Sequence, residues 1–329
     1  MRKMAALVAA GWATLLGIAQ PPVFRVPVRV VEVPVVATGR DGSPVRNLQA
    51  AEFRLLDNGR PQKIKVGYAD RPLSLAIVIQ TNDAVRAWLP EVRRAKSSIE
   101  ALLVGETGEA SLTTFDDEVK VRQSMTADVS LLDKAFNSLA LSGDKRLCLD
   151  AVNEAASQLE AVPPERRRII LIIGQPADVG SSTHLADILA RTEKSNIAVY
   201  QLAMPLVGLD LMEKTVAVTK IHGVALGNGT GIMGSVDLTN LIPEIMRGEK
   251  TSSGQEDLVI LTRELGGTRI PFRKLRELES GIGAIGRELH TGYVLSYTPD
   301  TDTAGYHAIG VEVLQANVTV RARPGYYLH

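Results

Sequence analysis

Residues Pro72–Ala84 read PLSLAIVIQTNDA, an apolar run that stops at the polar cluster Gln80-Thr81-Asn82-Asp83. A continuous run rich in Ile, Val and Leu predicts a strand that is buried on both faces of a parallel sheet. The polar cluster follows the carboxyl end of that strand, which is where open α/β sheets place their ligand sites. This stretch therefore predicts both the fold class and the place of a binding site.

Two further apolar runs, Ile169–Ile173 and Ile197–Leu202, alternate with amphipathic stretches. This alternation predicts an α/β fold with a doubly wound, mostly parallel, Rossmann-like sheet and right-handed helical crossovers. The stretch after Ala84 has apolar residues at helical spacing up to Leu102, and it predicts a surface helix whose buried stripe includes Leu102. The run Arg166-Arg167-Arg168 is interpreted as solvated surface.

Both ends of the chain have β patterns, with a hairpin-type turn at Asp57-Asn58-Gly59 and alternating strands from Tyr293 onward. We expect the two ends to form one small all-β domain. The predicted organisation is a signal peptide at 1–19, an N-terminal β segment at 20–72, an α/β domain at 73–290 with a variable insertion at 205–250, and a C-terminal β segment at 291–329.

The composition excludes several classes of function. Lys+Arg and Asp+Glu both number 37, and aromatic residues make up only 4% of the 329 residues. Neither a basic surface nor a base-stacking surface is indicated, so no nucleic-acid partner is expected. The single cysteine, Cys148, excludes an intramolecular disulfide and lies in step with apolar helical positions, which indicates a core residue.

The N-terminus starts with basic residues, continues with the apolar run Ala5–Ala19 and then reaches Gln20 and two prolines. This pattern predicts a secretory signal peptide, so we expect a periplasmic or extracellular protein that begins near Gln20. The alternative is an uncleaved anchor helix, although the run is short for a bilayer core of about 30 Å. A membrane contact is expected only through this segment.

Several motifs resemble the von Willebrand factor type A (VWFA) domain. They are the strand that ends in a polar cluster, the hairpin Thr114–Val119, the loop and helix with Leu149-Asp150-Ala151, and the strand after three arginines. The head motif Phe53–Ile64 and the tail Val320–Tyr327 resemble the bacterial family of secreted proteins related to that domain. The likeness covers nearly the whole mature chain.

The resemblance implies a metal-ion-dependent adhesion site at the top of the sheet, where Asp-x-Ser-x-Ser, a Thr and a second Asp hold Mg²⁺ through oxygen. Here Gln80, Asn82 and Ala84 stand at the Asp-x-Ser-x-Ser positions, Arg146 at the Thr and Gln175 at the last Asp. Both carboxylates have become neutral amides, and the Arg146 cation repels Mg²⁺. We therefore expect a degenerate site without metal or other cofactor.

The resemblance also implies a non-enzymatic protein-interaction module for adhesion or assembly, with no small-molecule substrate. Its protein partner is expected at the rim of the sheet, where the Arg146 guanidinium can hold a partner carboxylate bidentately. The predicted partner-binding residues are Gln80, Asn82, Asp83, Arg146 and Gln175.

Three alternatives stay open. The first is a Mg²⁺- or Ca²⁺-dependent adhesion module that uses the nearby acids Asp83, Asp116, Asp117 and Asp178. The second is a structural envelope component with no ligand on the rim. The third is an exported enzyme that uses the acidic rim or the glycine-rich stretch Gly223–Gly234, and it requires a buried cavity lined by convergent polar groups.

Overall fold

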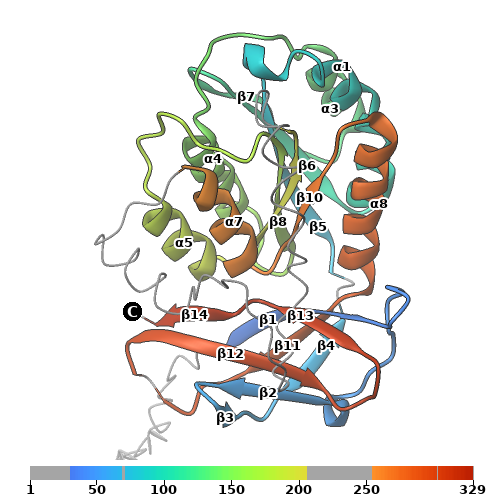
Figure 1. Ribbon diagram of the computed structural model, residues 1–329, viewed down its shortest axis with the longest axis vertical. Coiled ribbons are helices and arrows are strands. Elements are labelled where there is room, and N and C mark those ends of the chain that lie inside the picture. Colours follow the sequence, from blue (N-terminus) through green and yellow to red (C-terminus); the bar gives the residue numbers. More distant parts are fainter. Residues whose placement is uncertain (1–29, 69–70, 206–253, 302, 329) are drawn as a thin grey trace, which may run out of the picture.

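The computed structural model describes residues 30–68, 71–205, 254–301 and 303–328 (Figure 1). The predicted signal peptide, all of the predicted insertion except its first residue, and the glycine-rich stretch Gly223–Gly234 lie outside these described residues. No helix within the described ranges combines the length and the hydropathy that crossing a membrane requires.

The elements carry the labels of Figure 1. The strands are β1 (Val31–Thr38), β2 (Phe53–Asp57), β3 (Arg60–Pro61), β4 (Lys65–Tyr68), β5 (Leu73–Gln80), β6 (Glu109–Phe115), β7 (Val119–Thr126), β8 (Arg167–Gly174), β9 (Ile197–Ala203), β10 (Arg269–Pro271), β11 (Tyr293–Tyr297), β12 (Gly305–Val313), β13 (Thr319–Ala322) and β14 (Gly325–Leu328). The helices are α1 (Leu89–Arg94), α2 (Lys96–Ile99), α3 (Val129–Asn137), α4 (Cys148–Glu160), α5 (Leu185–Lys194), α7 (Gly254–Glu264) and α8 (Leu275–Thr291), with short segments η1 (Ala50–Glu52), η2 (Asp83–Val85) and η3 (Glu100–Val104).

The central sheet has the strand order β10-β9-β8-β5-β6-β7. Its strands pair in parallel except for β7, which is antiparallel to β6. Counted along the chain from β5, this is the order 3-2-1-4-5-6 of doubly wound folds, whose ligand crevice lies where the chain reverses direction. The predicted α/β class with a mostly parallel sheet is confirmed, and the reversal falls between β5 and β8.

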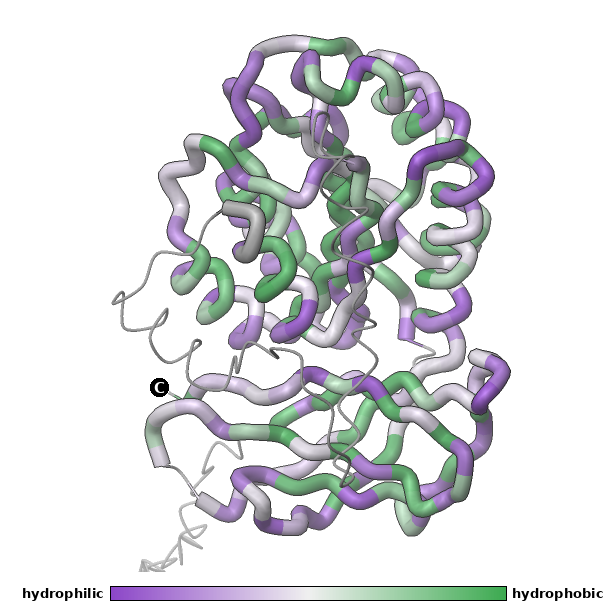
Figure 2. The backbone as a smooth tube through the Cα atoms, in the orientation of Figure 1, coloured by the Kyte–Doolittle hydropathy of each residue, from purple (hydrophilic) through white to green (hydrophobic). Residues whose placement is uncertain are grey.

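Helices cover both faces of this sheet (Figure 1). One core contains α1, α2, α3 and α8, and the other contains α4, α5 and α7. Every residue of β5 is buried, as the apolar run predicted, and Cys148 lies fully buried in the second core. Figure 2 shows the same pattern, because the hydrophobic residues concentrate in the central strands.

Strands from the two ends of the chain pair with each other below the central sheet (Figure 1). They form one sheet in the order β13-β1-β11-β4 and another in the order β14-β12-β2-β3. A third hydrophobic core fills the space between the sheets, and Leu48, Leu55 and Leu295 are among its fully enclosed side chains. Asn58 and Gly59 have positive φ in the β2–β3 hairpin, as the two central residues of a type I′ turn require.

The predicted surface helix after Ala84 is broken into α1, α2 and the π-helical segment η3. The amide of Gly105 bonds the carbonyl of Glu100, which closes the wider turn at 2.9 Å. This turn rotates the side chains relative to a regular helix. The prediction for Leu102 is therefore wrong: Leu102 is 44% exposed, while Leu103 is fully buried.

The interpretation of the three arginines at the start of β8, Arg166–Arg168, as solvated surface is also wrong, because all three are partly buried. Arg166 donates to the carbonyl of Leu73 at 2.7 Å, and Arg168 donates to the carbonyl of Val162 at 2.8 Å. The guanidinium of Arg167 bonds a backbone carbonyl at the end of α8. The three side chains thus bind backbone oxygens around the amino end of the central sheet.

Candidate functional site: an amide-lined rim

The parallel pairing of β5 with β8 brings Gln80 and Gln175 together, because Ile79 pairs with Ile173 and each glutamine follows closely. The backbone amide of Gln175 donates to Oε1 of Gln80 at 2.7 Å. Gly174 leaves the room for this contact, since a Cβ there would lie 3.0 Å from the Gln80 side chain. Two residues far apart in the sequence therefore form the floor of the predicted site.

Three buried amide side chains form one hydrogen-bonded network. Nε2 of Gln80 donates to Oδ1 of Asn82 at 2.7 Å and to Oε1 of Gln175 at 3.1 Å. Nδ2 of Asn82 donates to the carbonyls of Asp144 and Lys145 at 3.0 and 2.9 Å. The oxygens of these three amides already accept hydrogen bonds from N–H groups of the protein. N–H donors of the protein therefore lie where the resembled site has a metal ion and its ligands.

Arg146 completes this network from the loop before α4. Its Nη1 donates to Oε1 of Gln175 at 3.1 Å, and this is its one side-chain hydrogen bond to the described residues. Its backbone exchanges two hydrogen bonds with Val179, at 3.2 and 2.9 Å, so the loop is fixed to the segment after β8. Nε and Nη2 of this half-buried guanidinium have no acceptor in the part of the chain that the structure describes. We call Gln80, Asn82, Arg146 and Gln175 the amide rim.

Asp83, the fifth predicted partner-binding residue, does not join the amide rim. Its side chain is 61% exposed and pairs with Arg86 one helical turn away. Only its backbone amide turns inward, donating to the carbonyl of Gly143 at 3.3 Å. The short segment η2 starts at Asp83 and carries its side chain outward, so the sequence neighbour of Asn82 is not its neighbour in the site.

Asp116, one of the acids weighed for a shifted cation site, is 2% exposed and hydrogen-bonded within the protein. It accepts from the hydroxyl of Thr81 at 3.0 Å, from the hydroxyl of Ser142, and from the backbone amide of Glu118 at 3.1 Å. These bonds join the loops after β5 and β6 to the loop before α4. The carboxylate therefore acts as a structural connection between rim loops.

Asp117 accepts the backbone amides of Lys145 and Asp144, at 2.7 and 2.9 Å. These two hydrogen bonds, that from Lys145 first, lower the pKa of its carboxyl group. Gly143 precedes both amides with φ of +68°, so the loop turns sharply over Asp117. Within the described ranges, no three His, Cys, Asp or Glu side chains gather in a way that could hold a metal ion.

Asp178 and Asp150 connect α4 to the segment after β8. Asp178 accepts the amide of Leu149 at 2.9 Å and the hydroxyl of Ser181 at 2.6 Å. Asp150 accepts the amide and hydroxyl of Thr183, at 2.8 and 2.6 Å. Burial alone raises the pKa of Asp150, but the hydrogen bonds outweigh it and the net direction is down. In the sequence, only the cluster of hydroxyl residues after Gly180 could have indicated this contact.

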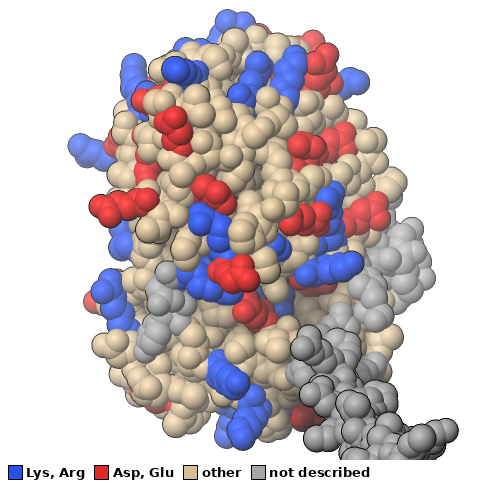
Figure 3. Space-filling model, turned by 180° about the vertical axis from the view of Figure 1, so that it is seen from behind, with Lys and Arg blue, Asp and Glu red and all other residues tan. Residues whose placement is uncertain are grey.

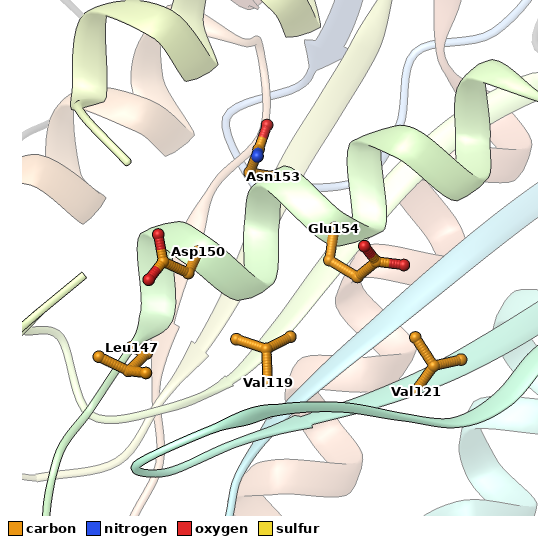
Figure 4. A pocket seen from close by; sticks show the side chains of 6 residues that line it. All are labelled: Val119, Val121, Leu147, Asp150, Asn153 and Glu154. Carbon is orange, nitrogen blue, oxygen red and sulfur yellow. The ribbon is translucent and has the colours of Figure 1, made fainter. Parts of the chain in front are cut away.

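A shallow hollow of about 480 Å³ lies between β7 and α4, beside the rim (Figure 4). Its lining residues are Val119, Val121, Leu147, Asp150, Asn153 and Glu154. Figure 4 shows that the Asp150, Asn153 and Glu154 side chains point in different directions from α4. The alternative of an exported enzyme requires polar groups that converge on one point of a cavity. The polar groups of this hollow do not converge in that way.

No family model and no curated protein sequence matches the chain. Among solved structures, it is similar to an aerotolerance-related membrane protein from Bacteroides fragilis with multiple mutations to serines, at 15% identity and TM-score 0.40, over 66% of this chain and 98% of that chain. It is also similar to the conserved hypothetical protein BatB from Bacteroides thetaiotaomicron, at 14% identity and TM-score 0.43, over 66% and 97%. A third is the SpRpn10 VWA domain, at 12% identity and TM-score 0.36, over 63% and 93%.

These identities and TM-scores are low, so the likenesses add nothing to the argument about the site. The fold assignment rests on the strand order of the chain itself and on the parallel pairing of β5 with its neighbours. In fold, the chain is similar to proteins with a von Willebrand factor type A domain, as its motifs indicated.

Proposed function

We propose that the chain is a non-enzymatic protein-interaction module, for adhesion or assembly, whose amide rim binds a carboxylate of a protein partner without a metal ion. The proposal rests on one observation: the Arg146 guanidinium is fixed against the amide rim by Gln175 while Nε and Nη2 have no acceptor among the described residues. A guanidinium held in this way offers a two-pronged donor to a carboxylate.

The rim is suited to a metal-free mechanism because a fixed positive charge stands where the resembled site has a cation. In the resembled site the cation attracts the partner's carboxylate, whereas here the protein itself supplies the charge. The amides of Gln80 and Asn82 add no negative charge to oppose an incoming anion. Preorganisation by buried hydrogen bonds also reduces the entropy that binding would otherwise cost.

The further parts of the proposal concern domain division and location. We infer a signal peptide at 1–19, a type A-like domain at 73–290 and one small β domain shared by segments 20–72 and 291–329. The mutual pairing of β1 with β11 and of β2 with β12 supports a shared β domain. Export to the periplasm or the outside is inferred from the N-terminal sequence pattern.

The test is partner capture from the native envelope fraction by the immobilised protein. Arg146→Asp reverses the charge at the rim and is expected to reduce capture at least about tenfold, while Arg146→Lys loses the fork geometry and gives an intermediate loss. Arg54→Asp is the matched control, because Arg54 is an exposed arginine on β2, outside the rim loops. It should capture as the wild type does.

EDTA should leave capture by the wild type unchanged. Equal capture by the wild type and Arg146→Asp would reject the proposal and favour a structural envelope component without a rim ligand. Loss of capture on adding EDTA would favour the cation-dependent alternative instead.

A further inference from the structure

A second cavity lies at the opposite end of the central sheet from the amide rim. It has a volume of about 250 Å³ and lies between the amino ends of β8 and β9 and the sheet that contains β1 and β11. Glu32 and Val294 line it from β1 and β11, and Arg323 lines it from the position after β13. Arg166, Arg167 and Arg168 line it from the start of β8. The cavity therefore lies at the junction of the two parts of the molecule.

The lining of this junction cavity is strongly cationic. Six of its residues carry a positive charge, namely Arg71, Arg166, Arg167, Arg168, Lys194 and Arg323, and two carry a carboxyl group, namely Glu32 and Glu193. The formal excess is thus four positive charges, in a chain whose net charge is zero. Figure 3 shows basic and acidic side chains intermixed across the middle of the rear face, so the excess of positive charge belongs to the cavity lining and not to the surrounding surface.

The two carboxyl groups do little to balance this charge. Glu32 is already paired with Arg71 at 3.0 Å. Glu193 accepts the backbone amide of Tyr327 at 3.0 Å, and burial raises its pKa to about 7, so it is partly protonated at neutral pH. Neither of these two carboxyl groups forms an ion pair with Arg166, Arg168 or Arg323.

Some of these arginines have clear structural partners. Arg166 is paired with Glu109 at 2.9 Å, and it also bonds a backbone carbonyl of β5. Arg168 donates to the carbonyls of Ser195 and Val162, at 3.1 and 2.8 Å, but its Nε is buried without an acceptor in the described chain. These contacts account for part of the positive charge and leave one donor of Arg168 unsatisfied.

Arg323 forms no ion pair with the described residues, although the charges of Glu193 and Glu32 act on it from a greater distance. The side chain is 7% exposed, it makes no hydrogen bond to the described residues, and its Nε is buried without an acceptor. Its closest defined contact is the ring of Tyr326, whose centroid lies 5.7 Å from the guanidinium carbon. Burying a guanidinium without hydrogen-bond acceptors is costly, so a group at this position that supplies oxygen acceptors would stabilise the fold.

We propose that the junction cavity binds a phosphate group, either as free phosphate or as the phosphate of a small ester, through Arg323 and Arg168, with Lys194 at its mouth. A planar guanidinium matches the oxygens of phosphate bidentately, and a doubly charged anion answers the charge excess better than a single carboxylate does. A cavity of 250 Å³ exceeds the roughly 30 Å³ share of one water several-fold, which leaves room for a phosphate and a short organic part.

The test is titration of the purified protein with inorganic phosphate and with glycerol phosphate, against chloride at matched ionic strength, by calorimetry and thermal denaturation. We expect one phosphate per chain and a rise in Tm that chloride does not give. Arg323→Met should weaken binding at least about tenfold, whereas Arg54→Met on β2 should bind as the wild type does. Equal heats and Tm in phosphate and chloride would overturn the proposal.

Two milder variants keep the test decisive if Arg323→Met folds poorly. Lys194→Ala removes an exposed cation and should weaken binding about threefold, and Glu193→Gln removes the opposing carboxylate and should tighten it about threefold. Unchanged affinity in both variants would reject the site. Arg146→Asp at the amide rim should bind phosphate normally, so this proposal and the proposed function can fail separately.

A lipid headgroup and a free phosphate ester share this chemistry, and vesicles distinguish them. Co-sedimentation with phosphatidylcholine vesicles that contain phosphatidic acid, when competed by free phosphate and lost in Arg323→Met, would assign a headgroup. Binding of the soluble phosphates without vesicle binding would assign a soluble ligand. Binding in neither arm would overturn the proposal.

Discussion

Nη1 of Arg146 lies 3.1 Å from Oε1 of Gln175, and the same oxygen accepts from Nε2 of Gln80 at 3.1 Å. Two N–H donors, one from the end of β5 and one from the loop before α4, therefore converge on one buried amide oxygen. If residue 175 carried a carboxylate that bound a metal, the metal and the two N–H donors would compete for the same oxygen. The amide instead joins a fixed cation to the floor of the rim.

The thermal stability of the protein should be the same in Mg²⁺ and in EDTA. The amide oxygens of Gln80 and Gln175 already accept hydrogen bonds, and the Arg146 charge opposes a cation. Differential scanning calorimetry in millimolar Mg²⁺, Ca²⁺ or EDTA should give Tm values within about 1 °C. A metal-dependent shift of several degrees would contradict both the proposed function and the assignment of the rim as metal-free.

Gln175→Leu should destabilise the protein by about 2–4 kcal/mol, because it removes the acceptor of two donors at once. Nε2 of Gln80 would keep Oδ1 of Asn82 as an acceptor. The hydrogen bond that Oε1 of Gln80 accepts from the backbone amide of residue 175 also depends on the position of this segment. Gln315→Leu on the exposed loop before β13 is the control and should change stability by less than about 0.5 kcal/mol. Urea unfolding measures both, and equal values would contradict the network.

Gly143→Ala should destabilise more than Gly42→Ala, although both glycines have positive φ, +68° and +77°. A Cβ at Gly143 would lie 2.7 Å from the carboxyl carbon of Asp117, whereas a Cβ at Gly42 meets nothing within 4 Å. The Gly42 variant bears the backbone cost of about 1 kcal/mol, and the Gly143 variant adds a steric cost of similar size. Urea unfolding compares the two, and partner capture should fall only in the Gly143 variant.

Leu103→Ala and Leu102→Ala test the π-helical segment η3. Leu103 is fully buried and Leu102 is 44% exposed. The first substitution should therefore cost about 2–5 kcal/mol, and the second less than about 0.5 kcal/mol. A regular helix with the predicted stripe would give Leu102 the larger cost, so denaturant unfolding of the two variants separates the two conformations directly.

Glu264→Gln should flatten the dependence of stability on pH. Burial raises the pKa of Glu264 to about 8, and its Oε1 has no hydrogen-bond partner in the described chain. Between the unfolded value of 4.5 and about 8, the folded state holds a proton that the unfolded state has lost. Stability must therefore fall as pH rises, by about 1.4 kcal/mol per pH unit between pH 5 and 7 from this group.

The measurement is urea unfolding of the wild type and Glu264→Gln at several pH values in that window. The two proteins should be similar in stability near pH 4.5, and the variant should be the more stable one above pH 7. Arg263 lowers the pKa and Glu193 raises it, so these neighbours stay unchanged in the experiment. Parallel slopes in the two proteins would show that Glu264 is ionised in the folded state.

Some predictions were met because they depend on local pattern alone. The all-apolar run of β5 could be buried on both faces only between other strands, and Cys148 shared a helical spacing with core residues. Asn58-Gly59 fixed a type I′ hairpin for the same local reason. No local pattern in the sequence predicted the proposed phosphate site. Arg323 lies in the tail motif Val320–Tyr327, and the family resemblance assigned no role to this residue.

The sequence by itself determined which stretches become central strands and which residue types stand at the carboxyl end of β5, and it is the basis of the prediction that those types do not bind Mg²⁺. Only the tertiary structure decided which side chains meet. Parallel pairing brought Gln80 to Gln175, and the start of η2 turned Asp83 away. The packing of the small sheet against β8 left Nε of Arg323 buried without an acceptor among the described residues. These contacts depend on how strands and helices that are distant in the chain are aligned and oriented against one another. The spacing and composition of a short stretch of sequence do not determine that alignment.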